Sequence, residues 1–205
     1  MKISLEHISK KFLKHWVFRD ITLDFEGPGT YAILGRNGSG KSTLLRIIAG
    51  MQSPSQGKVH YEYLQQKLNP NEIFQWVSFC APGMELIEEM SLIEFLQFHF
   101  SFKKIANNLS IQDIIEISGL SPHAHVLLGD YSSGMKQRVK LLQAIFADSP
   151  ILLLDEPCTN LDHHGITQYQ SWISAHTANR LVLVASNDPQ EYGFCTQTIS
   201  MESFS

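Results

Sequence analysis

Continuous apolar runs and alternating apolar and polar positions divide the chain into predicted strands. The runs Thr30–Leu34, Ile151–Leu154 and Leu181–Ala185 are short and almost entirely apolar. Runs of this kind are typical of strands that are covered on both faces. Lys2–His7 and Ile21–Phe25 alternate instead, which predicts strands with one buried face.

Three more segments have weaker strand patterns. Gly57–Tyr63 alternates and is typical of a strand at an exposed sheet edge. Val77–Ala81 is short and mostly apolar, and Pro82-Gly83 ends it. Thr196–Ser200 predicts a weak final strand.

Helical spacing of apolar residues lies between these strands. Leu44–Ala49 predicts a buried helix that ends at Gly50. Two later helices, the first beginning near Met135, each have one apolar face, made by Met135, Val139, Leu142 and Phe146 and by Ile166, Tyr169 and Ile173. Strands that alternate with helices predict an α/β fold with a mostly parallel sheet covered on both faces.

A helical block interrupts this alternation at roughly residues 84–130. Ser91-Leu92-Ile93-Glu94 fits a capping box, in which the serine and glutamate side chains bond backbone N–H groups at a helix start. Ser110-Ile111-Gln112-Asp113 predicts a second helix start, and Gly119 closes that helix. We interpret the block as a small subdomain inserted in the α/β core.

Length, charge and cysteine content exclude several classes of protein. The 205 residues suffice for one domain with a sizeable core. A net charge of −4 favours no nucleic-acid partner. No apolar run could span a bilayer, the first residues have no signal-peptide pattern, and three distant cysteines make no disulfide framework. We therefore expect a cytoplasmic protein that reaches a membrane only through a partner.

The most specific chemistry lies in Gly35-Arg36-Asn37-Gly38-Ser39-Gly40-Lys41-Ser42-Thr43, which fits the phosphate-loop pattern G-x-x-x-x-G-K-[ST]. Glycines permit a tight turn, backbone N–H groups converge on an anion, and the following helix adds its positive end. Lys41 would bind the β- and γ-phosphates, and the Ser42 hydroxyl would ligate Mg²⁺. The strand before the loop and the helix after it disfavour a plain glycine turn. The expected nucleotide contacts are Gly35, Asn37, Gly38, Ser39, Gly40, Lys41, Ser42 and Thr43.

Two carboxylates follow the apolar run Ile151–Leu154. In parallel sheets ligands bind at the carboxyl ends of strands, where both the glycine loop and these carboxylates fall. Asp155 would supply an oxygen ligand to Mg²⁺ beside Ser42, and Glu156 would act as general base toward water. Many buried strands end in acids without such a role, but the phosphate loop in the same chain favours the catalytic interpretation.

The aromatic-rich segment Phe12–Phe18 is expected to form a loop. Its rings would either stack on an adenine base, which contributes roughly 1–3 kcal/mol per base, or pack under the sheet. Composition alone does not decide between the two.

Taken together, the motifs resemble those of the ATP-binding cassette (ABC) family over almost the whole chain. Gly35–Thr43 resembles its first Walker motif, and Ile151–Glu156 the second with the catalytic glutamate. Tyr131–Arg138 is similar to the signature, usually Leu-Ser-Gly-Gly-Gln before a basic helix, and Thr159–Asp162 to the loop that crosses the dimer interface. The resemblance implies a P-loop NTPase core with an antiparallel β subdomain and a small helical insert.

The resemblance also implies cofactors, partners and roles. Two such domains, identical or different, pair head to tail, so that ATP and Mg²⁺ lie between one phosphate loop and the other subunit's signature. Ser132 and Gly134 would contact the γ-phosphate there, Phe12 would stack on adenine, and Val17 would flank the base. Hydrolysis would then drive transport through separate integral-membrane subunits, which hold the protein at the cytoplasmic face.

Some positions depart from the family pattern. Pro82 stands where the family has a glutamine, Asn187 stands at the switch histidine, and Ser133 and Met135 replace signature residues. Asn187 would still contact the γ-phosphate, but asparagine carries no charge, and charge-assisted hydrogen bonds are about twice as strong. We therefore expect ATP to bind and turnover to be reduced. An open alternative is a degenerate half of a heterodimer that binds ATP with little hydrolysis.

Phenylalanines are dense in the helical block, at Phe95, Phe98, Phe100 and Phe102. Most are expected to form the core of the subdomain. In the family, this block also helps to form a groove for a short helix of a membrane subunit. An ABC protein that acts on DNA or ribosomes usually has a second cassette or long coiled-coil insertions, and the sequence contains neither.

Overall fold

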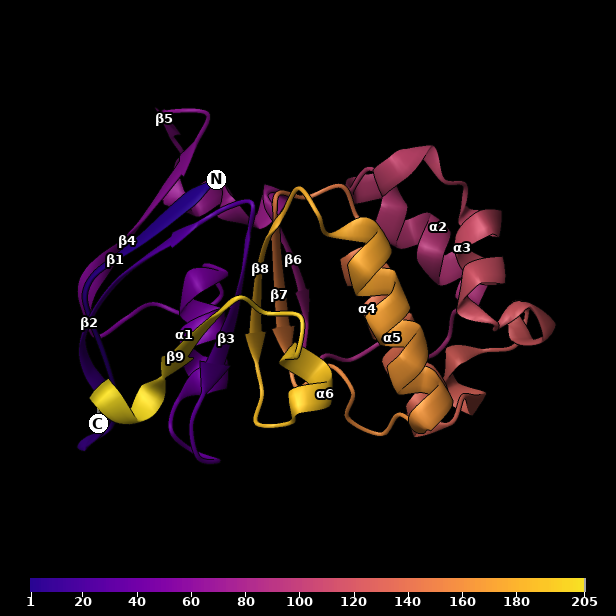
Figure 1. The fold of residues 1–205 in the computed structure, drawn as a ribbon. Coiled ribbons are helices and arrows are strands. Elements are labelled where there is room, and N and C mark those ends of the chain that lie inside the picture. Colours follow the sequence, from indigo (N-terminus) through magenta and orange to yellow (C-terminus); the bar gives the residue numbers. More distant parts are fainter. Residues whose placement is uncertain (205) are drawn as a thin grey trace.

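Two β-sheets form the framework of the computed structural model, which describes residues 1–204 (Figure 1). One sheet has the order β2-β1-β4-β5, and all its pairings are antiparallel. The other has the order β6-β7-β8-β3-β9, and all its pairings are parallel. The predicted α/β class, with a parallel sheet and a separate antiparallel one, is confirmed.

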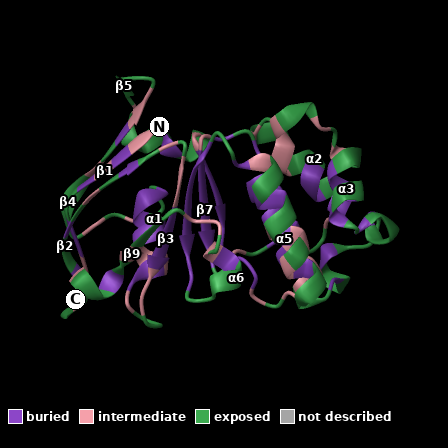
Figure 2. Cartoon of the chain, viewed as in Figure 1, coloured by how far each residue is buried: buried purple, intermediate pink, exposed green. Residues whose placement is uncertain are grey.

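The parallel sheet consists of β3 (Gly29–Leu34), β6 (Val77–Cys80), β7 (Ile151–Asp155), β8 (Leu181–Ala185) and β9 (Gln197–Ser200). Both faces of its central strands are covered, as the purple of β7 shows in Figure 2. In β7, Ile151 and Leu153 belong to one hydrophobic cluster while Leu152 and Leu154 belong to another. Successive side chains of a strand point to opposite faces, so a strand between two apolar layers must be apolar at every position.

The helices lie on both sides of this sheet (Figure 1). Helix α1 (Lys41–Ile48) packs between the two sheets in the cluster that contains Ile151. Helices α4 (Ser133–Ile145) and α5 (His163–His176) cover the other face, and the four-residue α6 (Pro189–Tyr192) follows β8. Within residues 1–204, no helix is both long and apolar enough to cross a bilayer.

The antiparallel sheet corrects two sequence-based expectations. Its strands are β1 (Lys2–Phe12), β2 (His15–Glu26), β4 (Gln56–Tyr63) and β5 (Gln66–Lys67). Phe12–Phe18 is not a loop but a hairpin, because Lys11 pairs with Trp16 and the Lys11 and Arg19 cations lie over the Trp16 ring.

Strand β4 does not lie at a bare edge, because it pairs with β1 on one side and with the short β5 on the other. The buried Tyr61 of β4 donates its hydroxyl proton to the carbonyl oxygen of Ile48, 2.9 Å away, which ties the sheet to α1. Strand β5 has only two residues, too few to show an alternating pattern, so this partner could not be predicted.

The helical block contains α2 (Leu92–Phe102) and α3 (Ile111–Ser118). Both predicted capping boxes are present, with Ser91 and Ser110 accepting from the backbone N–H of Glu94 and Asp113. Gly119 ends α3 in the left-handed conformation. The interpretation of residues 84–130 as a separate inserted subdomain remains a prediction. Short 3₁₀ helices span Pro70–Gln75, Ala106–Asn108, Ser121–His123, Leu128–Asp130 and Met201–Phe204.

Candidate nucleotide-binding site

The glycine loop joins the carboxyl end of β3 to the first residue of α1, Lys41. Gly35 and Gly40 both have positive φ, and neither position has room for a side chain. A Cβ at Gly35 would lie 2.6 Å from the Ser39 hydroxyl oxygen, and a Cβ at Gly40 would lie 2.6 Å from the Val17 side chain. The loop conformation therefore requires glycine at these two positions of the motif.

Lys41 folds back over the loop. Its side chain is buried at 5% exposure, and its ammonium donates to the carbonyl oxygens of Gly35 and Arg36 at 2.6 and 3.4 Å. In the described chain no carboxylate lies within ion-pair distance of it. The buried Ser39 hydroxyl also has no hydrogen-bond partner. A buried cation without a counter-ion and an unsatisfied hydroxyl in one loop fit a bound anion.

The predicted metal ligands lie in contact. The Ser42 hydroxyl donates to Oδ1 of Asp155 at 2.9 Å. Asp155 is 3% exposed, and burial raises its pKa, an effect that the Ser42 hydrogen bond partly offsets. Two hard oxygen donors at this point fit Mg²⁺, which retains several waters and needs few protein ligands.

Glu156 lies on a strained turn directly after β7. Its φ is 43°, in the left-handed region that non-glycine residues rarely adopt. Its backbone N–H donates to the carbonyl of Ala185 at 2.9 Å, and Thr159 donates to its carbonyl from both the backbone and the hydroxyl. These bonds hold the turn and leave the carboxylate exposed.

A groove of about 350 Å³ brings most of the predicted site together. The phosphate loop lines it from one side, and the half-exposed Phe12 and Glu156 contribute from the hairpin and from the end of β7. The Lys10 ammonium lies 5.1 Å from the centre of the Phe12 ring. The lining residues are Phe12, Val17, Asn37, Gly38, Gly40, Lys41, Ser42, Thr43 and Glu156.

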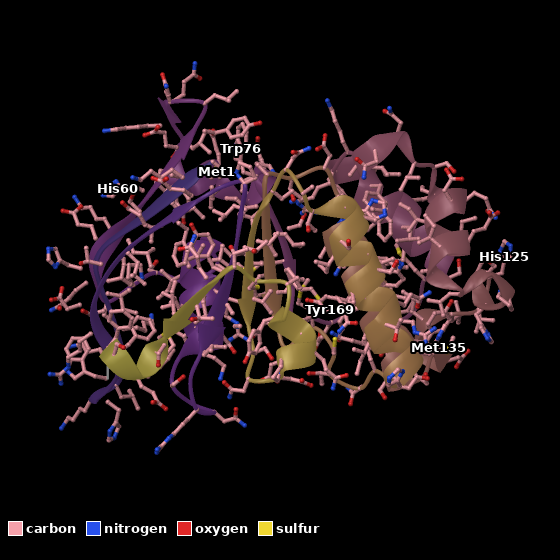
Figure 3. The ribbon with its side chains drawn as sticks, viewed as in Figure 1. Met1, His60, Trp76, His125, Met135 and Tyr169 are labelled. Carbon is pink, nitrogen blue, oxygen red and sulfur yellow. The ribbon has the colours of Figure 1, made fainter. Side chains whose placement is uncertain are left out.

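The signature residues do not line this groove. Ser132 is exposed and caps α4, because its hydroxyl accepts from the N–H of Met135; the helix therefore begins at Ser133, slightly earlier than expected. A Cβ at Gly134 would lie 2.9 Å from the carbonyl oxygen of Asn160, so the signature packs against the Thr159–Asp162 loop. Figure 3 labels Met135 near the ends of α4 and α5, away from the loop between β3 and α1 that Figure 1 shows.

Two residues that depart from the family pattern, Asn187 and Pro82, form hydrogen bonds with other residues. The backbone N–H of Gly35 donates to Oδ1 of Asn187 at 3.2 Å, which assigns the amide oxygen to this bond and leaves the nitrogen available as a donor. The carbonyl of Pro82 accepts from the Lys140 ammonium at 2.7 Å, and Pro82 lies outside the groove. Asn187 is thus placed beside the phosphate loop, and Pro82 is not.

Sequence reasoning missed two buried side chains that support the turn of Glu156. Gln137 of α4 donates to the carbonyl of Pro157 at 2.7 Å, and Glu191 of α6 accepts from the N–H of Cys158 at 2.7 Å. Polar residues in Met135–Lys140 and Asp188–Tyr192 look like ordinary solvent-facing positions, so no pattern marked them. Only the path of the chain in space brings them to residues 157 and 158.

Comparison with known proteins identifies the family. A family model described as "ABC transporter" matches residues 18–159. The chain belongs to the ABC transporter family. The predicted ABC-type ATPase and nucleotide-binding assignments are thereby confirmed.

Individual relatives cover most of this ABC protein. It is 34% identical over 165 residues to the uncharacterized ABC transporter ATP-binding protein YybJ of Bacillus subtilis, covering 80% of this chain and 75% of that protein. It is 29% identical over 195 residues to the cytochrome c biogenesis ATP-binding export protein CcmA of Rhizobium etli, covering 92% and 89%.

Among solved structures, the ABC chain resembles the dimeric post-hydrolysis state of the ATP-binding cassette MJ0796 bound to ADP and Pi. The TM-score is 0.83 at 22% identity, over 97% of this chain and 93% of that one. At this identity the likeness shows the fold.

Proposed function

We propose that the chain binds Mg²⁺-ATP in the groove described above, pairs head to tail with a second nucleotide-binding domain, and hydrolyses ATP to drive transport through separate membrane subunits. The observation that carries the proposal is the groove itself, because it joins the phosphate loop to an exposed aromatic ring and to Glu156. Lys41, Ser42, Asp155 and Glu156 are all present, which favours hydrolysis over a domain that only binds ATP.

Each residue of the groove has a distinct role in the reaction. Lys41 and the loop N–H groups would bind the phosphates, and Phe12 would stack on the base. Ser42 and Asp155 would hold Mg²⁺, which neutralises charge on the phosphates during transfer. Glu156 would accept a proton from the attacking water.

The amide nitrogen of Asn187 would donate to the γ-phosphate, because Gly35 already occupies the amide oxygen. This is a neutral contact, weaker than the charge-assisted contact of a protonated histidine. Turnover is therefore expected to be slower than with a histidine at this position.

The groove lacks a contact on the side of the γ-phosphate that the signature would provide. Ser132 is exposed at the N-terminus of the thirteen-residue helix α4, where N–H groups and the helix dipole favour an anion. Ser132 and Gly134 lie outside their own chain's groove, so in this proposal the signature would reach a γ-phosphate from a second domain. This placement supports the head-to-tail pairing.

A second, more apolar groove of about 470 Å³ fits a short helix of a membrane subunit. It lies between α1, the 3₁₀ helix Pro70–Gln75 and α2, and the exposed Met51 and Phe74 border it. Lys103 lines it, and burial lowers the pKa of this lysine to about 8. The Lys103 ammonium donates to the carbonyls of Phe74 and Val77, and in residues 1–204 no carboxylate pairs with it. The partner helix is therefore expected to be apolar with one acidic side chain, and it would hold the protein at the cytoplasmic face of the membrane.

ATP hydrolysis tests the catalytic assignment. Glu156→Gln should lower kcat by at least about 100-fold, since a positioned general base contributes typically 10²–10⁴. Glu89→Gln makes the same chemical change at an exposed glutamate outside the groove and should leave kcat unchanged. A wild-type turnover no higher than that of Glu156→Gln would refute the ATPase role of this chain alone.

Mixing two inactive variants tests the pairing. Lys41→Ala disables the phosphate loop, and Ser132→Arg blocks the signature. In a head-to-tail heterodimer of the two, one site combines the intact loop of one subunit with the intact signature of the other, so each heterodimer in the mixture should have up to half of the wild-type activity. No recovery on mixing, with each variant folded, would contradict the composite site.

A further inference from the structure

We propose that Glu191 is a positioning residue that fixes the loop of Glu156 relative to the loop of Asn187. The inference rests on the proposed function, because it concerns how that same ATPase site is held in register. It goes beyond the motif residues, since Glu191 lies outside the groove and would touch neither nucleotide nor metal.

The Glu191 carboxylate contacts both loops. It belongs to α6 and is only 5% exposed. One oxygen, Oε1, accepts from the backbone N–H of Cys158 at 2.7 Å, two residues after Glu156. The Ser186 hydroxyl, directly before Asn187, acts on this carboxylate as a donor that lowers its pKa. Helix α6 also continues the chain from Asn187, and the backbone N–H of Glu191 donates to the carbonyl of Asp188 at 2.9 Å. A single side chain therefore links the catalytic carboxylate's turn to the predicted γ-phosphate donor's turn.

Each end of this link is itself fixed. The Ser186 hydroxyl oxygen accepts from the N–H of Asp188 at 2.9 Å, which fixes the backbone on both sides of Asn187. The buried Tyr169 of α5 donates its hydroxyl proton to the backbone carbonyl of Glu191 at 2.8 Å. Figure 3 shows Tyr169 beside α6, so the short helix is anchored to the layer behind the sheet. The carboxylate is thus held rigidly enough to position the groups it bonds.

The negative charge of Glu191 is costly to the fold. In the described chain no lysine, arginine or histidine forms an ion pair with it. Burial raises its pKa, and Asp188 and Glu156 raise it further, while the bonds from Ser186 and Cys158 offset part of this effect. An unpaired buried charge is expensive, and a neutral amide would satisfy the same N–H at lower cost. The acid is explained by its stronger, charge-assisted bonds, which hold the two loops more tightly.

The turn of Glu156 needs such support, because its backbone conformation is unfavourable. It is held by Ala185 at its N–H, by Gln137 at the next carbonyl, and by Glu191 at Cys158. A displacement of about 1 Å in a catalytic group costs on the order of 100-fold in rate. Loss of the Glu191 link is therefore expected to lower kcat by about 10- to 100-fold, with KM for ATP changed less than about threefold, because the phosphate loop is untouched.

The test uses the full chain and two readouts. Amide hydrogen exchange reports on residues 156–162 and 185–189, and steady-state kinetics separate kcat from KM. Glu191→Ala should raise exchange in both segments together and lower kcat as stated. Glu191→Gln keeps an acceptor for the Cys158 N–H and should fall between wild type and Glu191→Ala in both readouts. Thr177→Val, the matched control, removes a buried hydrogen bond at the C-terminal end of α5, before β8 begins, and should leave kcat within twofold.

Several results would overturn the inference. Exchange that rises in only one segment, or in neither, would show that Glu191 does not link the loops. An active wild type with an equally active Glu191→Ala, or a Thr177→Val that loses as much kcat, would show a merely structural role. If Glu191→Ala does not fold, Glu191→Gln decides by the same readouts, and wild-type behaviour in both would refute the role of the charge. A wild type without ATPase activity refutes the proposed function instead, and the exchange result still decides whether the link exists.

Discussion

Asp155→Asn is expected to stabilise the protein without Mg²⁺-ATP and to destabilise it, relative to wild type, with Mg²⁺-ATP. The carboxylate is almost fully buried, and among the described residues only Ser42 donates a hydrogen bond to it. Burial raises its pKa even though Arg46 and Lys41 lie near enough to lower it. The buried charge therefore lowers the stability of the protein without Mg²⁺-ATP. Asparagine keeps the shape of the side chain and the Ser42 hydrogen bond but removes this destabilising charge.

The size of the effect follows from these contacts. Replacement of a buried ion pair by neutral residues is often neutral or stabilises by 1–4 kcal/mol, and we expect about 1–2 kcal/mol for Asp155 because Lys41 and Arg46 lie near it. For a domain of this length, 1 kcal/mol shifts Tm by about 2–4 °C, so Asp155→Asn should raise the Tm of the empty protein by about 2–8 °C. Ligand at 100 times its Kd stabilises by about 2.7 kcal/mol, and a 100-fold loss of affinity reduces this gain to about 0.4 kcal/mol. The order of the two proteins should therefore reverse on adding Mg²⁺-ATP.

Thermal unfolding with and without Mg²⁺-ATP measures both effects. Ser42→Ala is the matched control, because it also removes a metal ligand but deprives the buried carboxylate of its hydrogen bond. It should therefore lower Tm in the empty protein and weaken the response to Mg²⁺-ATP. An Asp155→Asn protein that is less stable than wild type when empty, or whose rank is the same in both conditions, would refute the reasoning.

Three further perturbations have defined outcomes. Phe12→Ala should weaken ATP binding by roughly 1–3 kcal/mol in calorimetry, the value of one stacked base, and unchanged affinity would exclude stacking. Asn187→Ala should lower kcat about fivefold with KM nearly constant, since one neutral hydrogen bond is worth about 1 kcal/mol, and a fall in affinity alone would place Asn187 outside the transition state. The pKa of Glu94 lies below its ordinary value of 4.5 because the Ser91 backbone and hydroxyl donate to it. The stability that Glu94 contributes is therefore full above pH 4.5 and is lost as the pH falls through the lower folded-state pKa. The Tm difference between wild type and Glu94→Ala should vanish at acidic pH. A constant difference would contradict this.

Local patterns predicted those parts of the fold whose cause is local. The runs ending at Leu34, Leu154 and Ala185 become the central parallel strands because burial on two faces requires an apolar residue at every position. The capping boxes at Ser91 and Ser110 form because serine and the acid three residues later satisfy each other's N–H groups within one turn.

Elements set by distant contacts could not be predicted. Leu64 and Gln65, which join β4 to β5, both have positive φ, although neither is a usual turn residue. The hairpin at Phe12 depends on cross-strand pairing and on cations over Trp16, neither of which composition reveals.

The candidate site likewise combines residues that a local motif predicts with residues that only the fold brings together. The phosphate loop is a motif because its chemistry lies in nine consecutive residues, and the structure brings Phe12 and Glu156 to it. Glu191 left no signal, since its partners Cys158 and Ser186 meet it only where the ends of β7 and β8 lie side by side.

In the proposed mechanism, the residues that depart from the family pattern make the turn of Glu156 more important in this chain. Asn187 accepts from the N–H of Gly35 and its amide cannot take up a proton, and the Pro82 carbonyl accepts from Lys140 away from the groove. Among the residues that line the groove, Glu156 is the only carboxylate and the only side chain able to accept a proton from water at neutral pH. In the proposed mechanism, proton removal depends on the position of this one exposed carboxylate, which sits on a strained backbone turn. It follows that substitutions behind the turn, at Glu191 and Gln137, should change kcat more than their distance from ATP suggests.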